Sequence, residues 1–479
     1  MNIIRVTCFA LGAFVFASSC SKEEAKPDVY DWDDGQIYFK TSLPAIASSR
    51  ANDMTLERLE SFQVTCFNTG DIKKDASGFV SPYFEDATFI RSVSSSAGPV
   101  YISLPGEGSY NWPKNGGQLK FFAFSPSRTA MAAGNKAVED KTGVSFFNLI
   151  NNTTDITTLS GIEYSLDRVR VNPDISKQFD FVTADAAGER WKDFTNSIDL
   201  AFHHQMAQVE LRAWGESDSY DFEIAGVRIG NPVVEGTFVF SGAATTANQW
   251  LTEESQVKDK VEYLYGNSQV TVDNVSTGDK VYYINNAEHN TLENAGSIMG
   301  LGGCAMVIPT VNSKWAGLAD SNISSIPYTT DKMYFSVLMR VSDSDSGKQL
   351  YPYIGNPYGM TVVPYAVDKS GTILARLYPG EKEGEFFSDA TLTQPYIAGE
   401  DITVKEFGWA AVPVDADWKA GKRYVYTLNY SEGVGVHDPE DPKPGKPILG
   451  KALISWGVSV DNWEYASKND DYNPDLVVP

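Results

Sequence analysis

The stretch that decides the fold is Leu200-Ala201-Phe202-His203-His204-Gln205-Met206-Ala207-Gln208-Val209-Glu210-Leu211. Its apolar and polar residues alternate, as they do when successive side chains of a β-strand point to opposite faces. The apolar positions are even at Leu200 and Phe202, but odd from Ala207 onward. A flat strand cannot change faces in this way. We therefore expect a β-bulge near Gln205-Met206 that takes up the extra residue.

Short segments of the same type continue in both directions. Residues 36–42 predict a first strand with Ile37 and Phe39 on one face, and residues 119–124 are apolar on both faces, as in a central strand. No sustained helical period occurs, and 39 Gly and 23 Pro separate the segments, which is typical of β-sandwiches. Further strands are expected at 62–67, 88–93, 100–104, 178–184, 222–229, 236–240, 281–284, 305–308, 333–341, 360–367, 424–430 and 454–460.

A Pro-rich acidic segment, residues 438–447, separates the last two alternating strands. Closely spaced prolines favour an extended chain, and charged side chains favour solvent. We expect this segment to be a stiff, exposed connector.

The N-terminus has the form of an export signal. One basic residue, Arg5, precedes an apolar run from Val6 to Ala17 that is too short to span a bilayer. Small residues and Cys20 follow, which resembles a bacterial lipobox, although Ala17 stands where a lipobox usually carries Leu. The resemblance implies a lipoprotein signal peptide at 1–19, lipid attachment at Cys20 and an acidic tether at 20–35. The alternative is an ordinary secretory signal that is cut nearby.

Composition narrows the function classes. The 479 residues carry a formal net charge of −23, which disfavours binding to nucleic acid or to anionic lipid headgroups. Hydrophobic residues make up 42% of the chain, so a globular fold is expected. No later stretch is long and apolar enough for a transmembrane helix.

Residues that carry enzymatic chemistry are sparse. Cys66 shares a phase with Phe62 and Val64, which predicts a small buried side chain on a strand, and whether it pairs with Cys304 stays open. His204 is expected to be a satisfied strand residue and His203 to point outward, rather than to form a metal site. No zinc, hydrolase-elbow or P-loop motif is present. We expect no enzyme activity, no cofactor and no metal.

Several segments, taken in chain order, resemble the fimbrillin family, the subunits of type V pili. The match rests on an aromatic strand that ends in Pro, a Phe-x-His strand, an Ile-Pro segment, a Trp-x-x-Gly-Lys-x-Tyr-x-Tyr strand and a closing strand. These are residues 121–126, 202–207, 306–309, 418–428 and 456–463.

The resemblance implies two consecutive Greek-key β-sandwich domains of transthyretin-like type, here 36–195 and 196–479 with a boundary near Asn196. It also implies that a trypsin-like protease cuts after an Arg behind the first strand, here Arg50. The vacated groove would then take a C-terminal strand of another subunit by β-augmentation. Residues 452–463 and the tail 474–479 are both candidate donors, and Arg50 could equally be an ordinary loop residue.

We therefore expect a structural, tip or accessory pilus subunit, exported as a surface-exposed outer-membrane lipoprotein. Its partners would be other pilin subunits, the outer membrane through the lipid on Cys20, and a host or bacterial surface ligand. The alternative is a surface glycan-binding β-sandwich lipoprotein whose exposed aromatic side chains stack on sugar rings.

Overall fold

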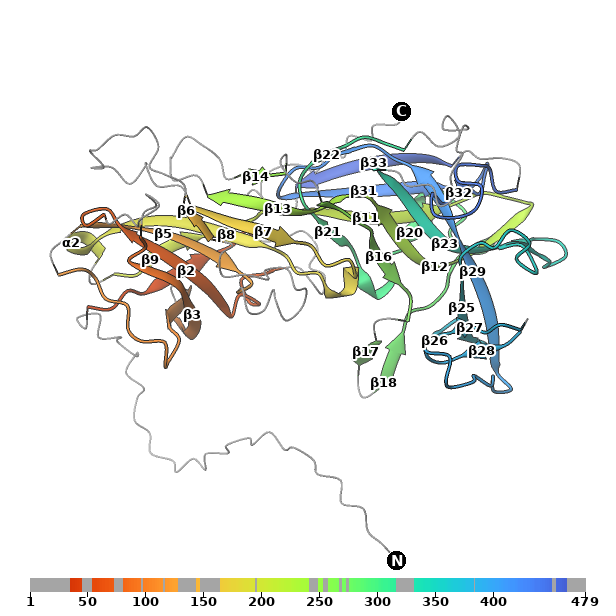
Figure 1. Cartoon of the computed structure of the whole chain (residues 1–479), viewed down its shortest axis with the longest axis horizontal. Coiled ribbons are helices and arrows are strands. Elements are labelled where there is room, and N and C mark those ends of the chain that lie inside the picture. The colour runs from red at the N-terminus through yellow and green to blue at the C-terminus, as the bar shows by residue number, and fades with distance from the viewer. Residues whose placement is uncertain are drawn as a thin grey trace, which may run out of the picture.

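The chain is built almost wholly from β-strands, as expected. The computed structural model describes residues 35–44, 54–72, 81–95, 98–114, 117–127, 144–146, 164–193, 196–240, 249–252, 257–266, 269–272, 275–315, 331–382, 384–449 and 454–462. Within these ranges, helical structure is limited to one short α-helix and three single 3-10 turns: α2 (Arg190–Asp193), η5 (Ile175–Lys177), η6 (Leu292–Asn294) and η7 (Gly300–Gly302). The molecule is elongated, with the early strands at one end and the late strands at the other (Figure 1).

The early strands form one eight-stranded sheet that closes on itself. Its order is β10 (His203–His204), β8 (Val182–Glu189), β5 (Gln118–Ser125), β2 (Ser61–Asn68), β3 (Phe84–Ser95), β4 (Gly98–Ser103), β1 (Phe39–Ser42) and β9 (Ile198–Ala201). The two outermost strands, β9 and β10, are consecutive in the chain and only Phe202 separates them. The sheet therefore wraps around one apolar cluster as a flattened barrel.

A second sheet covers the outer side of this barrel. It contains β14 (Gln249–Leu251), β13 (Val233–Phe240), β7 (Tyr164–Arg170), β6 (Val144–Phe146) and β15 (Val257–Lys258). The central strand β5 is buried on both faces, as expected: Phe121 faces the barrel interior, whereas Phe122 packs against Tyr164 and Phe240 of the second sheet. Both faces of this strand therefore carry hydrophobic side chains, because each face packs into a different hydrophobic core.

The late strands form a two-sheet sandwich. The smaller sheet contains β20 (Gly296–Ser297), β11 (Ala207–Trp214), β31 (Lys422–Asn429), β33 (Ser455–Asn462) and β21 (Ala305–Val307). Rings meet between the layers, as at Phe335 and Tyr426, whose centroids are 4.9 Å apart. The larger sheet contains β16 (Val261–Leu264), β12 (Tyr220–Gly230), β23 (Tyr334–Asp343), β29 (Ile402–Pro413), β25 (Val362–Asp368), β26 (Ile373–Arg376), β19 (Tyr282–Ile284), β24 (Gln349–Tyr351) and β32 (Val436–His437).

Three two-stranded pairs complete the described strands, and the strand orders skip along the chain as Greek-key connections do. The pairs are β17 (Gln269–Val272) with β18 (Val275–Gly278), β22 (Val311–Asn312) with β30 (Ala416–Asp417), and β27 (Tyr378–Pro379) with β28 (Phe386–Phe387).

The expected bulge near Gln205-Met206 is wrong. The alternating stretch is not one strand: β9 and β10 belong to the barrel, whereas β11 begins at Ala207 in the smaller sheet of the sandwich. The apolar phase changes because the chain leaves one core and enters another. The boundary near Asn196 stays a prediction, and strands on its two sides, β7 and β13, pair with each other.

Candidate functional site

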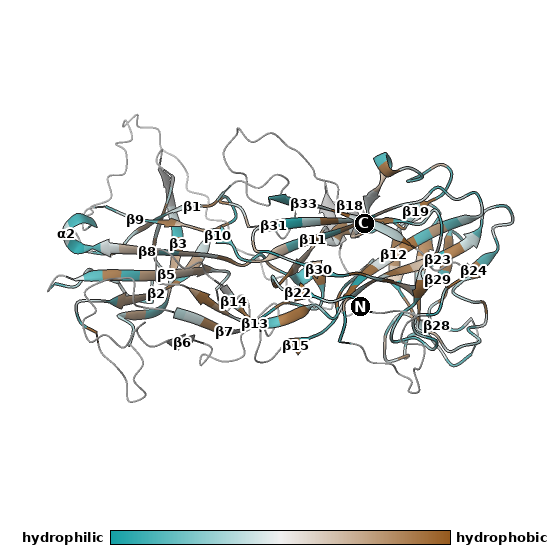
Figure 2. Ribbon diagram, turned by 90° about the horizontal axis from the view of Figure 1, so that it is seen from above, coloured by the Kyte–Doolittle hydropathy of each residue, from teal (hydrophilic) through white to brown (hydrophobic). Residues whose placement is uncertain are grey.

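The first described strand, β1, is an internal member of the barrel. It pairs antiparallel with β4, where Phe39 lies opposite Tyr101, and parallel with β9, where Phe39 lies opposite Ile198. Figure 2 places β1 beside β9 in the barrel. Since β1 has a neighbour on both sides, its removal would open the barrel and leave two strand edges without a partner.

Backbone hydrogen bonds hold β1 and the described residues just before it, from Gly35 to Ser42. The N–H of Trp112 donates to the carbonyl of Gly35 at 2.9 Å, and the N–H of Ile37 donates to the carbonyl of Tyr110 at 2.8 Å. On the other side, the N–H groups of Ile198 and Phe202 donate to the carbonyls of Tyr38 and Ser42, at 2.9 and 2.8 Å. The strand's place in the barrel, which we name the β1 slot, therefore runs from Gly35 to Leu43.

Side chains of alternate residues anchor β1 in the barrel core. Ile37, Phe39 and Leu43 are buried members of its apolar cluster. The Phe39 ring lies 4.7 Å from that of Phe89 and 5.2 Å from that of Phe121, both edge to face. At about 1.5–3 kcal/mol for each buried apolar side chain, the three residues contribute roughly 5–9 kcal/mol.

The walls of the β1 slot are apolar. Its lining comes from five strands and consists of buried side chains: Phe62, Phe89, Tyr101, Phe121, Ile198 and Leu200. Without β1, this surface and the edges of β4 and β9 would face water. Such a site is suited to bind an extended strand with apolar side chains at every second position.

The two site residues predicted from the sequence, Cys20 and Arg50, lie outside the described residues. The described chain stops at Pro44, just after β1, and resumes at Met54. Lipid attachment at Cys20 and cleavage after Arg50 stay predictions.

One of the two candidate donor segments is described. β33 is hydrogen-bonded to β31 along all eight of its residues and to no other strand among the described residues. Trp456, Val458 and Val460 alternate along it and continue the phase of Ile454 just before it; Ile454 is buried, Trp456 and Val458 are half-buried, and Val460 is 50% exposed. This edge strand therefore carries an apolar face that its own sheet covers only in part. The other candidate, 474–479, lies outside the described residues.

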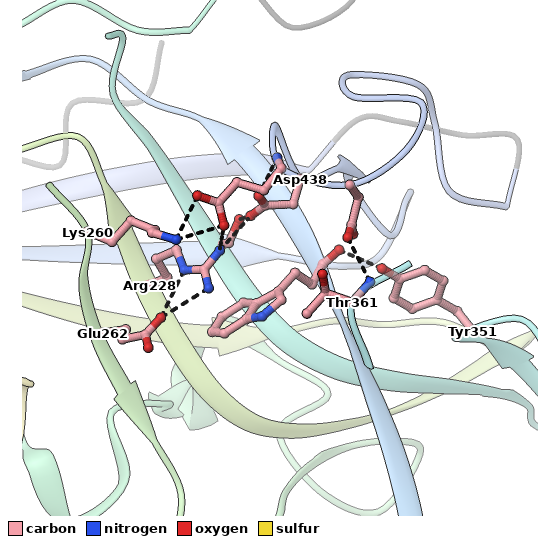
Figure 3. A network of polar contacts seen from close by, with 10 residues as sticks. Arg228, Lys260, Glu262, Tyr351, Thr361 and Asp438 are labelled. Atoms are coloured by element: carbon pink, nitrogen blue, oxygen red, sulfur yellow. Dashed lines mark hydrogen bonds and ion pairs between the residues drawn. The ribbon is translucent and has the colours of Figure 1, made fainter. Parts of the chain in front are cut away.

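The loop before β33 contradicts the expected exposed connector. Most of residues 434–449 are buried or half-buried, and Ile448 is fully buried. Asp438 accepts a hydrogen bond from Ser336 and lies 3.5 Å from Nη1 of Arg228, whose guanidinium also contacts Glu262 at 3.0 Å (Figure 3). From the sequence, the acidic side chains of this segment are expected to face solvent. In the structure, Asp438 instead contacts the buried guanidinium of Arg228.

A second carboxylate fixes the same loop. The N–H of Thr361 donates to Oδ1 of Asp441 at 3.0 Å (Figure 3). Burial raises the pKa of Asp441 to about 7. Burial, with Lys443 and Lys446 nearby, lowers the pKa of the neighbouring His437 to about 4. The loop is thus fixed by its own contacts up to Leu449, independently of β33.

The remaining residues singled out in the sequence are structural. Cys66 and Cys304 are buried in different core clusters and do not form the disulfide that the sequence left open. His204 is buried with its Nδ1 2.7 Å from Oδ2 of Asp180, and His203 is exposed, as predicted. Within the described part of the chain, no group of three or more His, Cys, Asp or Glu side chains could hold a metal ion.

Aromatic side chains bear on the glycan-binding alternative. Of the tryptophans in the described ranges, only Trp191 is exposed, at 82%, and all the others are buried or half-buried. Stacking of sugar rings therefore has no cluster of exposed tryptophans to use in the described ranges.

As for membrane contact, no helix of these ranges has the length and apolar character to cross a bilayer.

Solved structures that match the chain include proteins of Bacteroides and Parabacteroides. A suggested cell adhesion protein of Bacteroides ovatus ATCC 8483 is 11% identical, with a TM-score of 0.36, and the match covers 90% of this chain and 99% of that one. A suggested cell adhesion protein of Parabacteroides distasonis ATCC 8503 is 8% identical, with a TM-score of 0.36 and coverage of 91% and 99%. At these TM-scores neither structure bears on function, and no curated protein sequence matches the chain.

Fold and site together define an all-β protein of several sheets, whose first described strand lies between two other strands of a barrel and completes its wall. The sequence model for the fimbrillin-like family matches residues 49–299, more than half of the chain. The chain therefore belongs to the fimbrillin-like family and is a fimbrillin-like surface protein.

Proposed function

We propose that this chain is a pilus subunit, exported as an outer-membrane lipoprotein through Cys20 and assembled by protease-triggered strand exchange. Cleavage after Arg50 would separate β1 from the rest of the chain. The observation that carries the proposal is the position of β1: it is internal to the barrel, it fills an apolar slot, and it precedes Arg50 in the chain.

β33 of a second copy is the occupant that the described residues favour. It offers apolar side chains at 454, 456, 458 and 460, with the same spacing as positions 37, 39, 41 and 43 of the strand it would replace. About four such side chains gain roughly 6–12 kcal/mol before the entropy of association is subtracted. The exchanged strand would also satisfy the edges of β4 and β9.

Limited cleavage of the purified protein tests this proposal. Brief treatment with trypsin should yield a new N-terminus at Ala51, identified by mass spectrometry, and filaments visible by negative-stain electron microscopy. The variant Arg50→Ala should stay intact at this position and stay monomeric under the same treatment. A cleanly cut protein that remains monomeric would contradict strand exchange.

Lipidation is tested separately in cells. Metabolic labelling with a palmitate analogue should mark the wild-type protein and leave Cys20→Ala unlabelled. A labelled Cys20→Ala protein, or an unlabelled wild type, would remove the lipoprotein part of the proposal without affecting strand exchange.

A further inference from the structure

The end of the β1 slot next to Leu43 is closed by a short segment, residues 54–60, which we name the end plug. Leu59 is a fully buried member of the barrel's apolar cluster, and Met54 and Leu56 pack against that cluster. A turn shapes the segment, since the N–H of Leu59 donates to the carbonyl of Thr55 at 2.9 Å. The plug thus occupies the barrel interior beyond the point where β1 ends.

Two polar anchors hold the end plug, and the first of them is buried. Oδ2 of Asp180 accepts the N–H of Met54 at 3.0 Å and lies 2.7 Å from Nδ1 of His204, and both of these side chains are almost fully buried. His204 lies two residues after Phe202, whose N–H donates a hydrogen bond to the carbonyl of Ser42 at the end of β1. This anchor therefore places Met54 at the closed end of the slot.

The second anchor comes from the other wall of the slot. Nη2 of Arg91 donates to the carbonyl of Leu59 at 3.0 Å and also to that of Leu56. The hydroxyl of Tyr101, which lies opposite Phe39 in the sheet, donates to the carbonyl of Leu59 as well. All of these contacts join residues at or beyond position 54, so none of them involves a residue that cleavage after Arg50 would remove.

We propose that the end plug is a fixed stop that sets the register of an incoming strand, with Asp180 and Arg91 as its positioning residues. The inference rests on the proposed strand exchange. Alternation of apolar residues excludes a slip of one residue, because every side chain would change faces. It does not exclude a slip of two residues, which keeps the same face toward the core.

The plug separates these remaining registers. A strand shifted two residues toward the plug would place a side chain in space that Leu59 fills. A strand shifted two residues the other way would leave the Leu43 position empty, with the cost of an internal cavity. Only one register fills the slot without overlap or void.

Disulfide trapping between two copies measures the register. Ala201→Cys in the acceptor places a thiol on an exposed position of β9, opposite Ser42. Donor copies carry one cysteine each, at Ser455, Gly457, Ser459 or Asp461, on the face of β33 opposite its apolar residues. Both copies are the full chain with Cys20→Ser; they are cut, mixed and oxidised, and each cross-link is quantified. With the acceptor that carries Ala201→Cys and no further test substitution, the cross-link yield at one donor position should be at least tenfold above the yields at the neighbouring positions.

Four acceptor variants then test the stop. Asp180→Leu removes the anchor, and Leu59→Ala shortens the stop while its backbone contacts stay in place. Both should spread the cross-links over donor positions two residues apart, to within about threefold of each other. Asp180→Asn keeps an oxygen for Met54 and should retain the single position. Tyr265→Phe, which loses a buried hydrogen bond to Ile298 far from the slot, should also retain it.

The outcomes separate the two proposals. A single cross-linked position in both Leu59→Ala and Asp180→Leu would overturn the stop and leave strand exchange standing. Absence of any cross-link with the acceptor that carries no further test substitution would overturn strand exchange and the stop with it. Should Asp180→Leu fail to fold, Leu59→Ala alone decides.

Discussion

Phe39 is the residue on which the retention of β1 depends most. Its ring meets three others at the centre of the barrel, those of Phe62, Phe89 and Phe121. Its neighbour Lys40 shares the same backbone pairing but is only half-buried. These two positions therefore separate the contribution of core packing from that of strand pairing.

We expect Phe39→Ala to lower the free energy of unfolding by about 3–5 kcal/mol, because a buried ring is lost and a cavity replaces it. Lys40→Ala is the matched control and should change it by about 0.5 kcal/mol or less. Urea unfolding followed by circular dichroism measures both. Equal effects of the two substitutions would mean that the Phe39 side chain does not anchor β1.

Asp441, in the loop before β33, makes the free energy of unfolding depend on pH. Its pKa is about 7 in the folded protein and about 3.9 in an unfolded chain. Between these values the folded state holds a proton that the unfolded state has lost, so stability falls as pH rises. Asp441→Asn keeps an oxygen for Thr361 and removes this loss. We expect it to match the wild type near pH 4 and to exceed it by about 2–4 kcal/mol at pH 8.

His437 acts in the opposite direction. Its pKa of about 4 lies below the ordinary value of about 6.5, so its contribution to stability is complete above pH 6.5 and is lost as pH falls through 4. In Asp441→Asn this second dependence is no longer offset. Urea unfolding across pH 4–8 should therefore show stability rising with pH in the variant. A variant without any gain at pH 8 would contradict a raised pKa at Asp441.

Among the elements, β33 is an edge strand whose loss we expect the rest of the fold to tolerate. Within the described ranges it pairs with β31 alone, and the loop before it is fixed by Asp438 and Asp441. Burial of Trp456 and Val458 is partial, so the strand contributes roughly 2–3 kcal/mol through apolar contacts. An element held in this way is suited to leave its own sheet for another.

A chain truncated after Leu449 tests this expectation. We predict that it folds, with a modest drop in melting temperature, and that after cleavage it accepts a strand but offers none. Mixed in increasing proportion with cut full-length protein, it should shorten the filaments seen by electron microscopy. Trp456→Ser in the full chain is a milder companion and should weaken assembly without altering the fold. Unshortened filaments would mean that β33 is not the donor.

Strand positions could be predicted from the sequence because alternation is a local property. The predicted strands at 119–124 and 424–430 correspond to β5 and β31, and the burial of β5 on both faces was predicted correctly. Sheet membership could not be predicted in the same way, since it depends on partners far along the chain. The stretch 200–211 shows the difference: its phase change marks a passage between two sheets, which has the same local pattern as a bulge.

The candidate site was predictable only in part, for a similar reason. The apolar face of residues 36–42 indicated a buried strand, and the structure places it inside the barrel. The loop 438–447 was misjudged because the cation that neutralises it, Arg228, lies more than two hundred residues earlier. Nothing near Asp438 in the sequence signals that contact. The end plug likewise depends on Asp180 and Arg91, which only the fold brings to Met54 and Leu59.

At the scale of the whole molecule, the proposed donor strand and the proposed acceptor barrel lie in different parts of an elongated chain. β1 belongs to the barrel at one end, and β33 belongs to the sandwich at the other (Figure 1). A strand from one copy that enters the barrel of the next gives a head-to-tail contact, and repetition of such a contact produces a filament. The shape of the subunit thus agrees with linear assembly by strand exchange.

The most direct test of the central claim, that β1 must leave before a second copy can bind, is a disulfide that holds β1 in place. Ser42 and Ala201 lie opposite each other in β1 and β9, and both are exposed, so Ser42→Cys with Ala201→Cys can form a bond across the pair. After cleavage, electron microscopy should show monomers while the bond is oxidised and filaments once a reductant is added. Filaments from the oxidised protein, or none after reduction, would contradict the claim.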